Sequence, residues 1–196
     1  ESIAVLTKQL DATWADGNNT GGLAAGVALA AATWYHYHTL GKAAETATPN
    51  GGFDTDIDAA NLLVDADVVT AGYTKYRYRG SVLTDGSSNI IAFYQFHDLF
   101  LWVSPPEDIS VAAQPNTAVS YTLSTPLDVK TVAIQNFHVS SPASAALYVT
   151  SLDQDDDAAD EAVGRASLRR TSDNQAVVGD VRTLTNTASQ IRLRSS

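Results

Sequence analysis

Two histidines on one predicted strand are the first residues of this chain whose spacing could support chemistry. His36 and His38 lie two residues apart among alternating aromatic residues, so their side chains would project from the same face of a strand. Two imidazoles on one face are half of a metal site, with His97 as the candidate third ligand. A shared face does not by itself make a metal site, so we prefer an aromatic strand packed against its neighbours and predict no metal ligand.

The acidic residues form the second candidate. They alternate over residues 54–58, and the run DQDDDAADE begins at Asp153. A calcium loop of the EF-hand type needs Gly at its sixth position and Glu at its twelfth. Counted from Asp153, those positions hold Ala158 and Gly164. We therefore predict a solvated acidic loop between two strands. The scattered basic residues would form ion pairs with this loop or contact other subunits; they are Lys130, Arg165, Arg169 and Arg170.

Catalytic motifs are missing from the sequence. It contains no Gly-x-Ser-x-Gly elbow, no cysteine nucleophile and no glycine-rich phosphate loop before a helix. A carboxylate pair for glycoside hydrolysis is not specified by any spacing. We expect a protein that is not an enzyme, with no catalytic residue and no cofactor.

Composition narrows the partners and the environment. The chain has 196 residues and a net charge of −10, which argues against binding nucleic-acid phosphates. The longest apolar run, residues 23–34, is too short to cross a bilayer, so no membrane insertion is expected. We interpret this run as a buried loop or short helix of small residues. The alternative is a close contact between subunits, because Ala and Gly let backbones approach.

The elements that would position these residues are mostly strands. Residues 72–83 and 89–96 flank the polar turn 85–89, and they predict a hairpin with an apolar central second strand. Residues 99–103 either continue that strand past a kink at His97-Asp98 or begin another. Pro105 and Pro106 end that strand. Further strands are expected over 3–10, 33–40, 118–124, 130–140, 145–152, 166–171, 176–184 and 190–194, with loops over 16–22 and 41–52 and at most a short helix over 54–70.

This pattern predicts an all-β chain. About eleven short strands with turns between them are typical of an antiparallel β-sandwich or a jelly roll. We expect an N-terminal β lobe over residues 1–104 and a C-terminal β lobe over 105–196, or one continuous sandwich. The tyrosines Tyr73, Tyr76, Tyr78 and Tyr94 could form a sugar-binding platform, but we favour core and interface roles for them.

Several segments resemble structural proteins of tailed bacteriophages, especially tail-fibre and other appendage proteins. They are GYTKYRYRGSV and TDGSSNIIAFYQ within 72–95, TWYHY at 33–37, Gly21-Gly22-Leu23, and TNTASQIR at 185–192. The resemblance is strongest over about residues 14–103, where the sequences of the predicted strands and of the turn are similar. The sequence departs from the usual paired basic residues at Tyr78-Arg79, and it starts at Glu1 without any Met, as expected of a processed product or part of a longer protein.

The resemblance implies a component of the virion, an extracellular particle assembled in the host cytoplasm. We expect an oligomeric appendage protein, a tail fibre or head spike, that forms homotrimers, contacts other virion proteins and supports host attachment. One alternative is a decoration or cement protein that stabilises the capsid. Another is a carbohydrate-binding receptor module that contacts host surface glycan.

Overall fold

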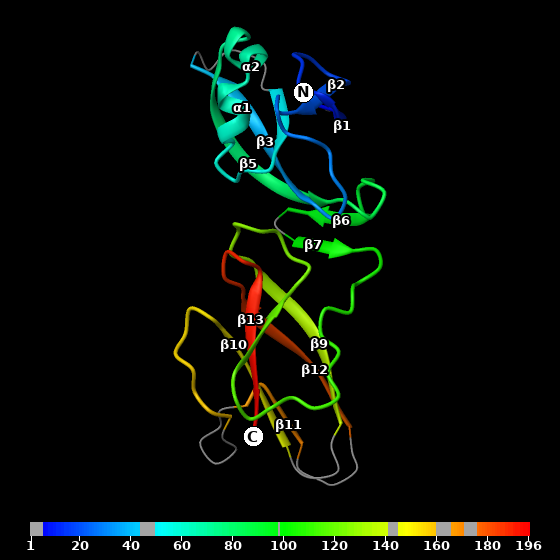
Figure 1. Ribbon diagram of the computed structural model, residues 1–196, viewed down its shortest axis with the longest axis vertical. Coiled ribbons are helices and arrows are strands. Elements are labelled where there is room, and N and C mark those ends of the chain that lie inside the picture. The colour runs from blue at the N-terminus through cyan, green and yellow to red at the C-terminus, as the bar shows by residue number, and fades with distance from the viewer. Residues whose placement is uncertain (1–5, 44–49, 98, 141–144, 160–165, 171–175) are drawn as a thin grey trace. The chain divides into compact units, whose positions relative to one another are not determined.

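The computed structural model divides the chain into two compact units, Glu1–Pro105 and Pro106–Ser196. It describes residues 6–43, 50–97, 99–140, 145–159, 166–170 and 176–196 (Figure 1). The first unit has two hydrophobic clusters and the second has one.

The N-terminal unit is built on one five-stranded sheet. Its spatial order is β1 (Lys8–Thr13), β2 (Thr20–Leu23), β4 (Asn50–Asp54), β3 (Trp34–Lys42) and β5 (Tyr73–Leu83). β3 lies antiparallel between β4 and β5, whereas β1 with β2 and β2 with β4 are parallel pairs. The unit also contains α1 (Ala60–Val64), α2 (Ala66–Thr70) and a separate two-stranded sheet of β6 (Phe93–Phe96) and β7 (Leu99–Trp102).

Two hydrophobic clusters stabilise this unit. In one, Leu40 of β3 packs with Leu62 of α1 and Val68 of α2, and Figure 1 shows both helices lying against β3 and β5. The other contains Tyr35, Phe53 and Val82. Alternation along β3 explains the arrangement, because Tyr35 and Leu40 have opposite parity and so project from opposite faces.

Glycine makes two strands possible where loops were expected. The predictions of loops over 16–22 and 41–52 are wrong at β2 and β4; residues 44–49 lie outside the described residues. A side chain at Gly51 would overlap the ring of Tyr37, and one at Gly52 would place its Cβ 2.7 Å from Leu62 Cδ2. Neighbouring side chains occupy the space that a residue with a Cβ needs, so these strands lack the β-branched signal.

The predicted hairpin between 72–83 and 89–96 is not formed. The turn exists, because the Asp85 carboxylate accepts hydrogen bonds from the backbone N–H groups of Ser87 (2.8 Å) and Asn89 (2.9 Å). Beyond it, a single bridge joins Thr84 and Ile90, and β5 pairs with β3 instead. β6 pairs with β7, so the expectation of a central strand covered on both faces is also wrong.

The C-terminal unit is a small two-layer β structure. One layer is a four-stranded sheet in the order β11 (Leu168–Arg170), β10 (Ala145–Ser151), β13 (Gln190–Ser195) and β8 (Val119–Thr122). The other is a ribbon of β9 (Val132–Ser140) and β12 (Ala176–Leu184). Ala133 and Val181 of the ribbon share a buried cluster with Val149 and Ile191 of the sheet. Burial between the two layers is what forms this core.

The all-β prediction is confirmed, and four of its details are corrected. The described residues contain thirteen strands instead of eleven, and two short helices instead of at most one. The sheet of the N-terminal unit is mixed instead of purely antiparallel. The strand expected over 3–10 begins at Lys8, and residues 1–5 lie outside the described part of the chain.

The apolar run 23–34 forms a loop and not a helix. Its beginning is buried at Ala24, and much of the remainder is exposed. The buried Tyr35 holds the loop: its hydroxyl donates to the Ala28 carbonyl (2.8 Å) and accepts from the Ala30 N–H (2.7 Å). The loop therefore satisfies backbone groups through a core side chain.

Candidate functional site

His36 and His38 share the face of β3 that also carries Leu40, and both are buried. β5 brings Tyr78 to this face, with its ring centroid 6.0 Å from each imidazole. The ring centroid of Tyr76 lies 5.7 Å from that of His38. The result is an interleaved set of two imidazoles and two phenol rings between neighbouring strands, as the histidine spacing predicted for an aromatic strand.

His36 belongs to a short internal hydrogen-bond network. Its Nδ1 lies 2.8 Å from Ser81 Oγ, which lies 2.8 Å from the hydroxyl of Tyr78. A serine beside a histidine is the pairing that nucleophilic catalysis uses. Here both side chains are buried, and Tyr78 occupies the other side of the serine hydroxyl. The geometry suits a structural network that satisfies buried polar groups.

His38 has one satisfied ring nitrogen and one open one. Its Nε2 lies 3.2 Å from the carbonyl oxygen of Asp56, which can only accept, so this nitrogen carries the proton. Its buried Nδ1 has no hydrogen-bond partner among the described residues. Burial lowers the pKa of His38, partly offset by the hydrogen bond to Asp56 and by the charges of Asp54, Asp56 and Asp58. The imidazole is therefore held in its neutral form.

The alternating acids hydrogen-bond within the local chain. The buried carboxylate of Asp54 accepts from the backbone N–H groups of Asp56 (3.0 Å) and Leu62 (2.9 Å) and from Asn61 Nδ2 (2.7 Å). It thereby satisfies an N–H group in the first turn of α1. Within the described ranges, no group of three or more His, Cys, Asp or Glu residues could hold a metal ion. His97, the candidate third ligand, lies in the β6–β7 turn against Phe96.

The four tyrosines of the predicted sugar platform do not share a surface. Tyr73 is buried edge-on against Trp14, and Tyr78 is half-buried. Tyr76 is partly exposed and donates to Asp58 Oδ1 (3.0 Å). Tyr94 lies in the β6–β7 sheet. For Tyr73 the core role is the one the structure has.

The outward face of the β6–β7 hairpin is the main feature that sequence reasoning missed. Cross-strand pairs Tyr94–Leu101 and Phe96–Leu99 expose four large apolar side chains, by 69%, 51%, 73% and 44% respectively. The alternate face carries Phe93, Phe100 and Trp102, whose rings contact one another and, through Trp102, Trp34 of β3. The nearly continuous apolar pattern was the available signal, and it equally fits a strand covered on both faces.

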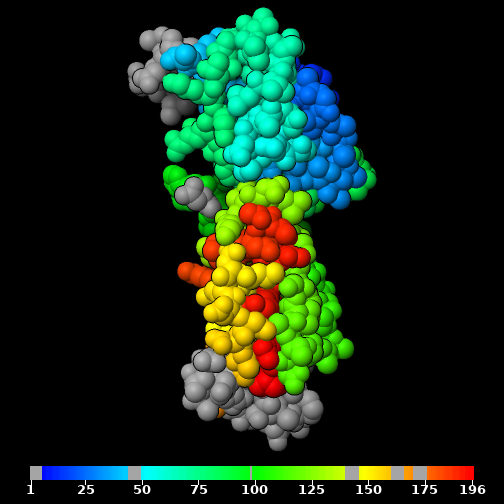
Figure 2. Space-filling view, turned by 60° about the vertical axis from the view of Figure 1, so that its left-hand side comes forward, coloured from blue at the N-terminus to red at the C-terminus, as the bar shows by residue number. Residues whose placement is uncertain are grey.

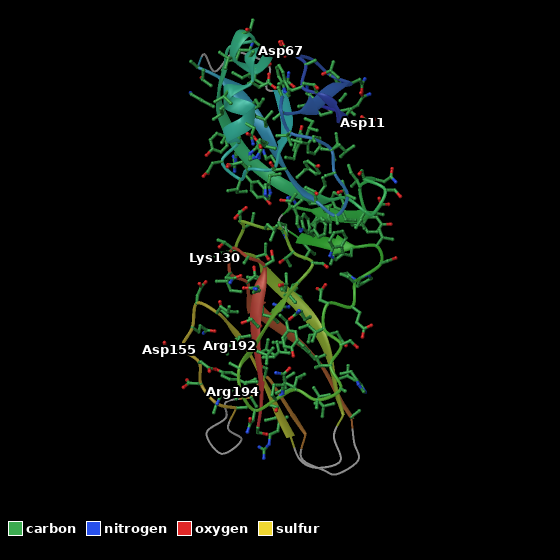
Figure 3. All side chains as sticks on the ribbon, in the orientation of Figure 1. Asp11, Asp67, Lys130, Asp155, Arg192 and Arg194 are labelled. Carbon is green, nitrogen blue, oxygen red and sulfur yellow. The ribbon has the colours of Figure 1, made fainter. Side chains whose placement is uncertain are left out.

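The acidic loop is solvated as predicted over its described residues, 153–159. Asp153 pairs with Lys130 (2.8 Å), and Asp156 lies 3.1 Å from Arg194 Nη1 and 3.7 Å from Arg192 Nε. Arg192 Nη2 also donates to the carbonyl oxygens of Gln154 and Asp155 (2.7 Å each). Figure 3 labels Lys130, Asp155, Arg192 and Arg194 around this loop.

Lys130 was predicted to pair with the loop, and it does so. Arg192 and Arg194 of β13 also pair with it, which was not predicted. Arg165 lies outside the described residues. Figure 2 shows the loop and β13 side by side at the surface of this unit. The cations neutralise part of an acidic surface and present no basic patch there.

The fold defined here is a mostly β protein of two units. No family model, curated protein or solved structure matches the chain. None of the helices in the described ranges is long and apolar enough to cross a membrane.

Proposed function

We propose that this chain is a non-enzymatic structural component of a tailed-phage virion, an oligomeric appendage protein such as a tail fibre or head spike that supports host attachment. The observation that carries the proposal is the uncharged outward face of the β6–β7 hairpin. Exposed contiguous apolar side chains of this kind mark surfaces that contact other proteins. The resemblance of several segments to phage appendage proteins is the reason for proposing a tailed-phage virion as the assembly.

The placement of the reactive side chains supports the same proposal. His36 and Ser81 are buried and bonded to each other, and Asp54 is buried beneath α1. Groups that work on a substrate must be able to reach it. These polar residues thus serve the interior, while the outward face of the β6–β7 hairpin exposes uncharged side chains.

The first experiment asks whether the chain belongs to particles. Virions of the phage that encodes it are purified through a density gradient, and their proteins are quantified by mass spectrometry. We expect the chain to remain with the particles at the copy number of an appendage. A copy number that follows the capsid lattice would favour the cement protein, and recovery only in the soluble lysate would overturn the proposal.

The second experiment asks whether the hairpin face drives assembly. The mass of the purified chain is measured by light scattering, and three chains or a multiple of three supports a fibre or spike. Tyr94→Ser combined with Phe96→Ser should lower this mass, because it removes two exposed rings from the face. The matched control is Val64→Ser, which removes an equally exposed apolar side chain from α1. A monomeric wild type would favour the cement role.

A receptor module for host glycan is the second candidate, and one observation favours it. Tyr94 and Phe96 stand two residues apart on β6, so their exposed rings point the same way. Flat rings can stack on sugar faces. Binding to host polysaccharide that is lost in Tyr94→Ser, with the assembly mass unchanged, would assign the face to recognition. Loss of assembly without any glycan binding would assign it to subunit contact.

A further inference from the structure

The ribbon of the C-terminal unit has a long and regular open edge. β12 pairs with β9 over its whole length, from Ala176–Ser140 to Leu184–Val132, without any register shift. In the described part of the chain β9 is the only strand in the β12 ladder. Leu168 of β11 packs beside Gly179, but no described strand forms a ladder with the opposite edge of β12. The backbone N–H and C=O groups of that edge are ones that another strand could pair with.

The outward side chains of β12 form a pattern that is complementary to its own reverse: apolar residues match apolar ones, and each charge matches an opposite charge. Val178, Asp180, Arg182 and Leu184 alternate along the strand and share its outer face. Val178 and Leu184 are 61% and 41% exposed, and both charged residues between them are exposed. The order is apolar, acidic, basic, apolar. An antiparallel copy of this strand offers an apolar residue for each apolar one and the opposite charge for each charge.

We infer that β12 pairs antiparallel with β12 of a second copy of this chain, about a two-fold axis at Val181. In this register Val178 opposes Leu184 of the second copy, and Asp180 opposes Arg182 of the second copy. Both contacts occur twice, as a two-fold axis requires. The two ribbons then form one four-stranded antiparallel sheet.

The charged groups are available for this contact. Asp180 uses Oδ1 to accept from Asn136 Nδ2 (3.0 Å), which leaves Oδ2 for an arginine. Across the described residues, Arg182 makes no ion pair or side-chain hydrogen bond within the chain. Opposite charges directly across antiparallel strands are favourable, and like charges there are unfavourable. The pairing places Arg182 opposite a carboxylate that it lacks in the single chain.

β5, the long edge strand of the N-terminal unit, has features that protect a strand edge from pairing with another copy. β5 carries Lys75, Arg77 and Arg79, all exposed and all positive, and its pairing with β3 contains two register shifts. Positive charges and bulges are two devices that prevent edge strands from pairing with copies of themselves. β12 has an unbroken register and charges that cancel in the paired form.

The contact is small. One strand edge with its outer row of side chains covers less than the roughly 800 Å² per partner of a standard interface. We therefore expect association that depends on concentration, giving a dimer by itself and a hexamer if a trimer also forms. The inference does not depend on a role in the virion.

The test is a charge exchange in the full chain. Dissociation constants are measured by sedimentation equilibrium for the wild type, Asp180→Arg, Arg182→Asp and the double exchange. Each single change should weaken the two-fold contact by about tenfold, because it sets like charges opposite each other twice. The double exchange should restore the wild-type constant within about threefold, since each new arginine again opposes an aspartate.

A control separates the contact from local effects. Asp180→Arg also removes the hydrogen bond from Asn136, so Asn136→Ala tests that loss alone. It should leave the two-fold contact in place. Circular dichroism of each variant verifies that the ribbon is folded, and the double exchange keeps the test valid if one single variant folds poorly.

Introduced cysteines fix the register, because the chain has no cysteine of its own. Val178→Cys and Leu184→Cys are mixed and oxidised with oxidised glutathione. Opposed residues of paired strands lie about 4.5–5.5 Å apart at Cα, which suits a disulfide. Stacked sheets lie about 10 Å apart, which does not. We expect a disulfide-linked dimer in the mixture and none from either variant alone.

Three results would overturn the inference. The first is a wild type that shows no two-fold association at any concentration. The second is association that the single charge reversals leave unchanged, which would assign it to another surface such as the β6–β7 hairpin. The third is cysteine cross-linking that is no greater in the mixture than in the separate variants.

Discussion

The two units treat buried polar groups differently. In the N-terminal unit the buried side chains include His36, His38, Asp54 and Asp65. In the C-terminal unit, over the residues that the structure describes, the buried polar side chains carry only hydroxyl groups. The charged residues that form ion pairs there are partly exposed, as in the pairs of Asp156 with Arg192 and Arg194.

The difference has a physical cause. A buried carboxylate or imidazole has a high desolvation cost and persists only where hydrogen bonds compensate it. Asp54 accepts three hydrogen bonds, and Asp65 accepts from the backbone N–H groups of Ala25 (2.7 Å) and Asp67 (2.9 Å). These carboxylates attach short helices and a loop to the sheet. The C-terminal layers meet through apolar side chains and need no such attachment.

The largest expected effects come from cavities in the two cores. Leu62→Ala and Ile191→Ala each remove a fully buried side chain, from α1 and β13 respectively. Each should lower the free energy of unfolding of its own unit by about 3 kcal/mol. Hydrogen exchange followed by NMR measures the two units separately. If either variant lowers protection equally in both units, they unfold as one cooperative body, and the comparison between them fails.

The next effect contrasts a buried charge with a buried hydroxyl. Asp54→Ala leaves buried donors of Asn61 and Leu62 unpaired and should cost about 3 kcal/mol. Thr185→Val removes a hydroxyl that accepts from the Thr131 N–H (3.1 Å) and should cost about 1 kcal/mol. Urea unfolding followed by circular dichroism measures both. Equal costs would mean that the carboxylate is no more important than a hydroxyl.

The third prediction concerns pH. Burial lowers the pKa of His38 in the folded protein, so between that value and about 6.5 the unfolded chain binds more protons. The free energy of unfolding of the N-terminal unit should therefore fall as pH is lowered from 7.5 through about 6.5, and level off below the folded pKa. Urea unfolding at several pH values measures this slope.

Two variants test the assignment to His38. His38→Phe should flatten the slope, because it removes the group that titrates. His138→Phe changes an exposed histidine of β9 and should leave the slope unchanged. A slope that survives in His38→Phe would assign the pH response to another group.

The smallest effect is expected at the acidic loop. Asp156→Ala removes partly exposed ion pairs to Arg192 and Arg194 and should cost about 0.5 kcal/mol at low salt. The cost should vanish in about 1 M salt, where exposed charges are screened. Thermal unfolding at two salt concentrations measures it. A loss that persists at high salt would show that the loop has a packing role.

The sequence predicted the C-terminal strands closely because their pattern is local. Residues 176–184 were expected as a strand and form β12 with the same bounds, and β9, β10 and β13 differ by one or two residues at an end. β12 alternates exposed and less exposed residues along its length, so its pattern is preserved. β10 is buried at nearly every residue, and its run of apolar residues was the signal instead.

The N-terminal errors come from contacts distant in the sequence. β4 is glycine-rich because Tyr37 and Leu62 fill the space beside it, and a local pattern contains no information about them. The 85–89 turn was recognised, but the choice of β3 over β6 as the partner of β5 depends on a strand far upstream. The histidine face was predictable from a spacing of two, whereas the hydrogen bond to Ser81 was not.

All three tryptophans lie in the N-terminal unit: Trp14 donates to the Gly51 carbonyl (2.8 Å), and Trp34 lies 5.9 Å from Trp102. Indole emission excited at the red edge of absorption will therefore report this unit alone, while the C-terminal unit is spectrally silent apart from its tyrosines. The Trp34–Trp102 pair is close enough for exciton coupling. A far-ultraviolet couplet that disappears in Trp102→Phe would serve as an optical reporter of whether the β6–β7 hairpin is seated on β3.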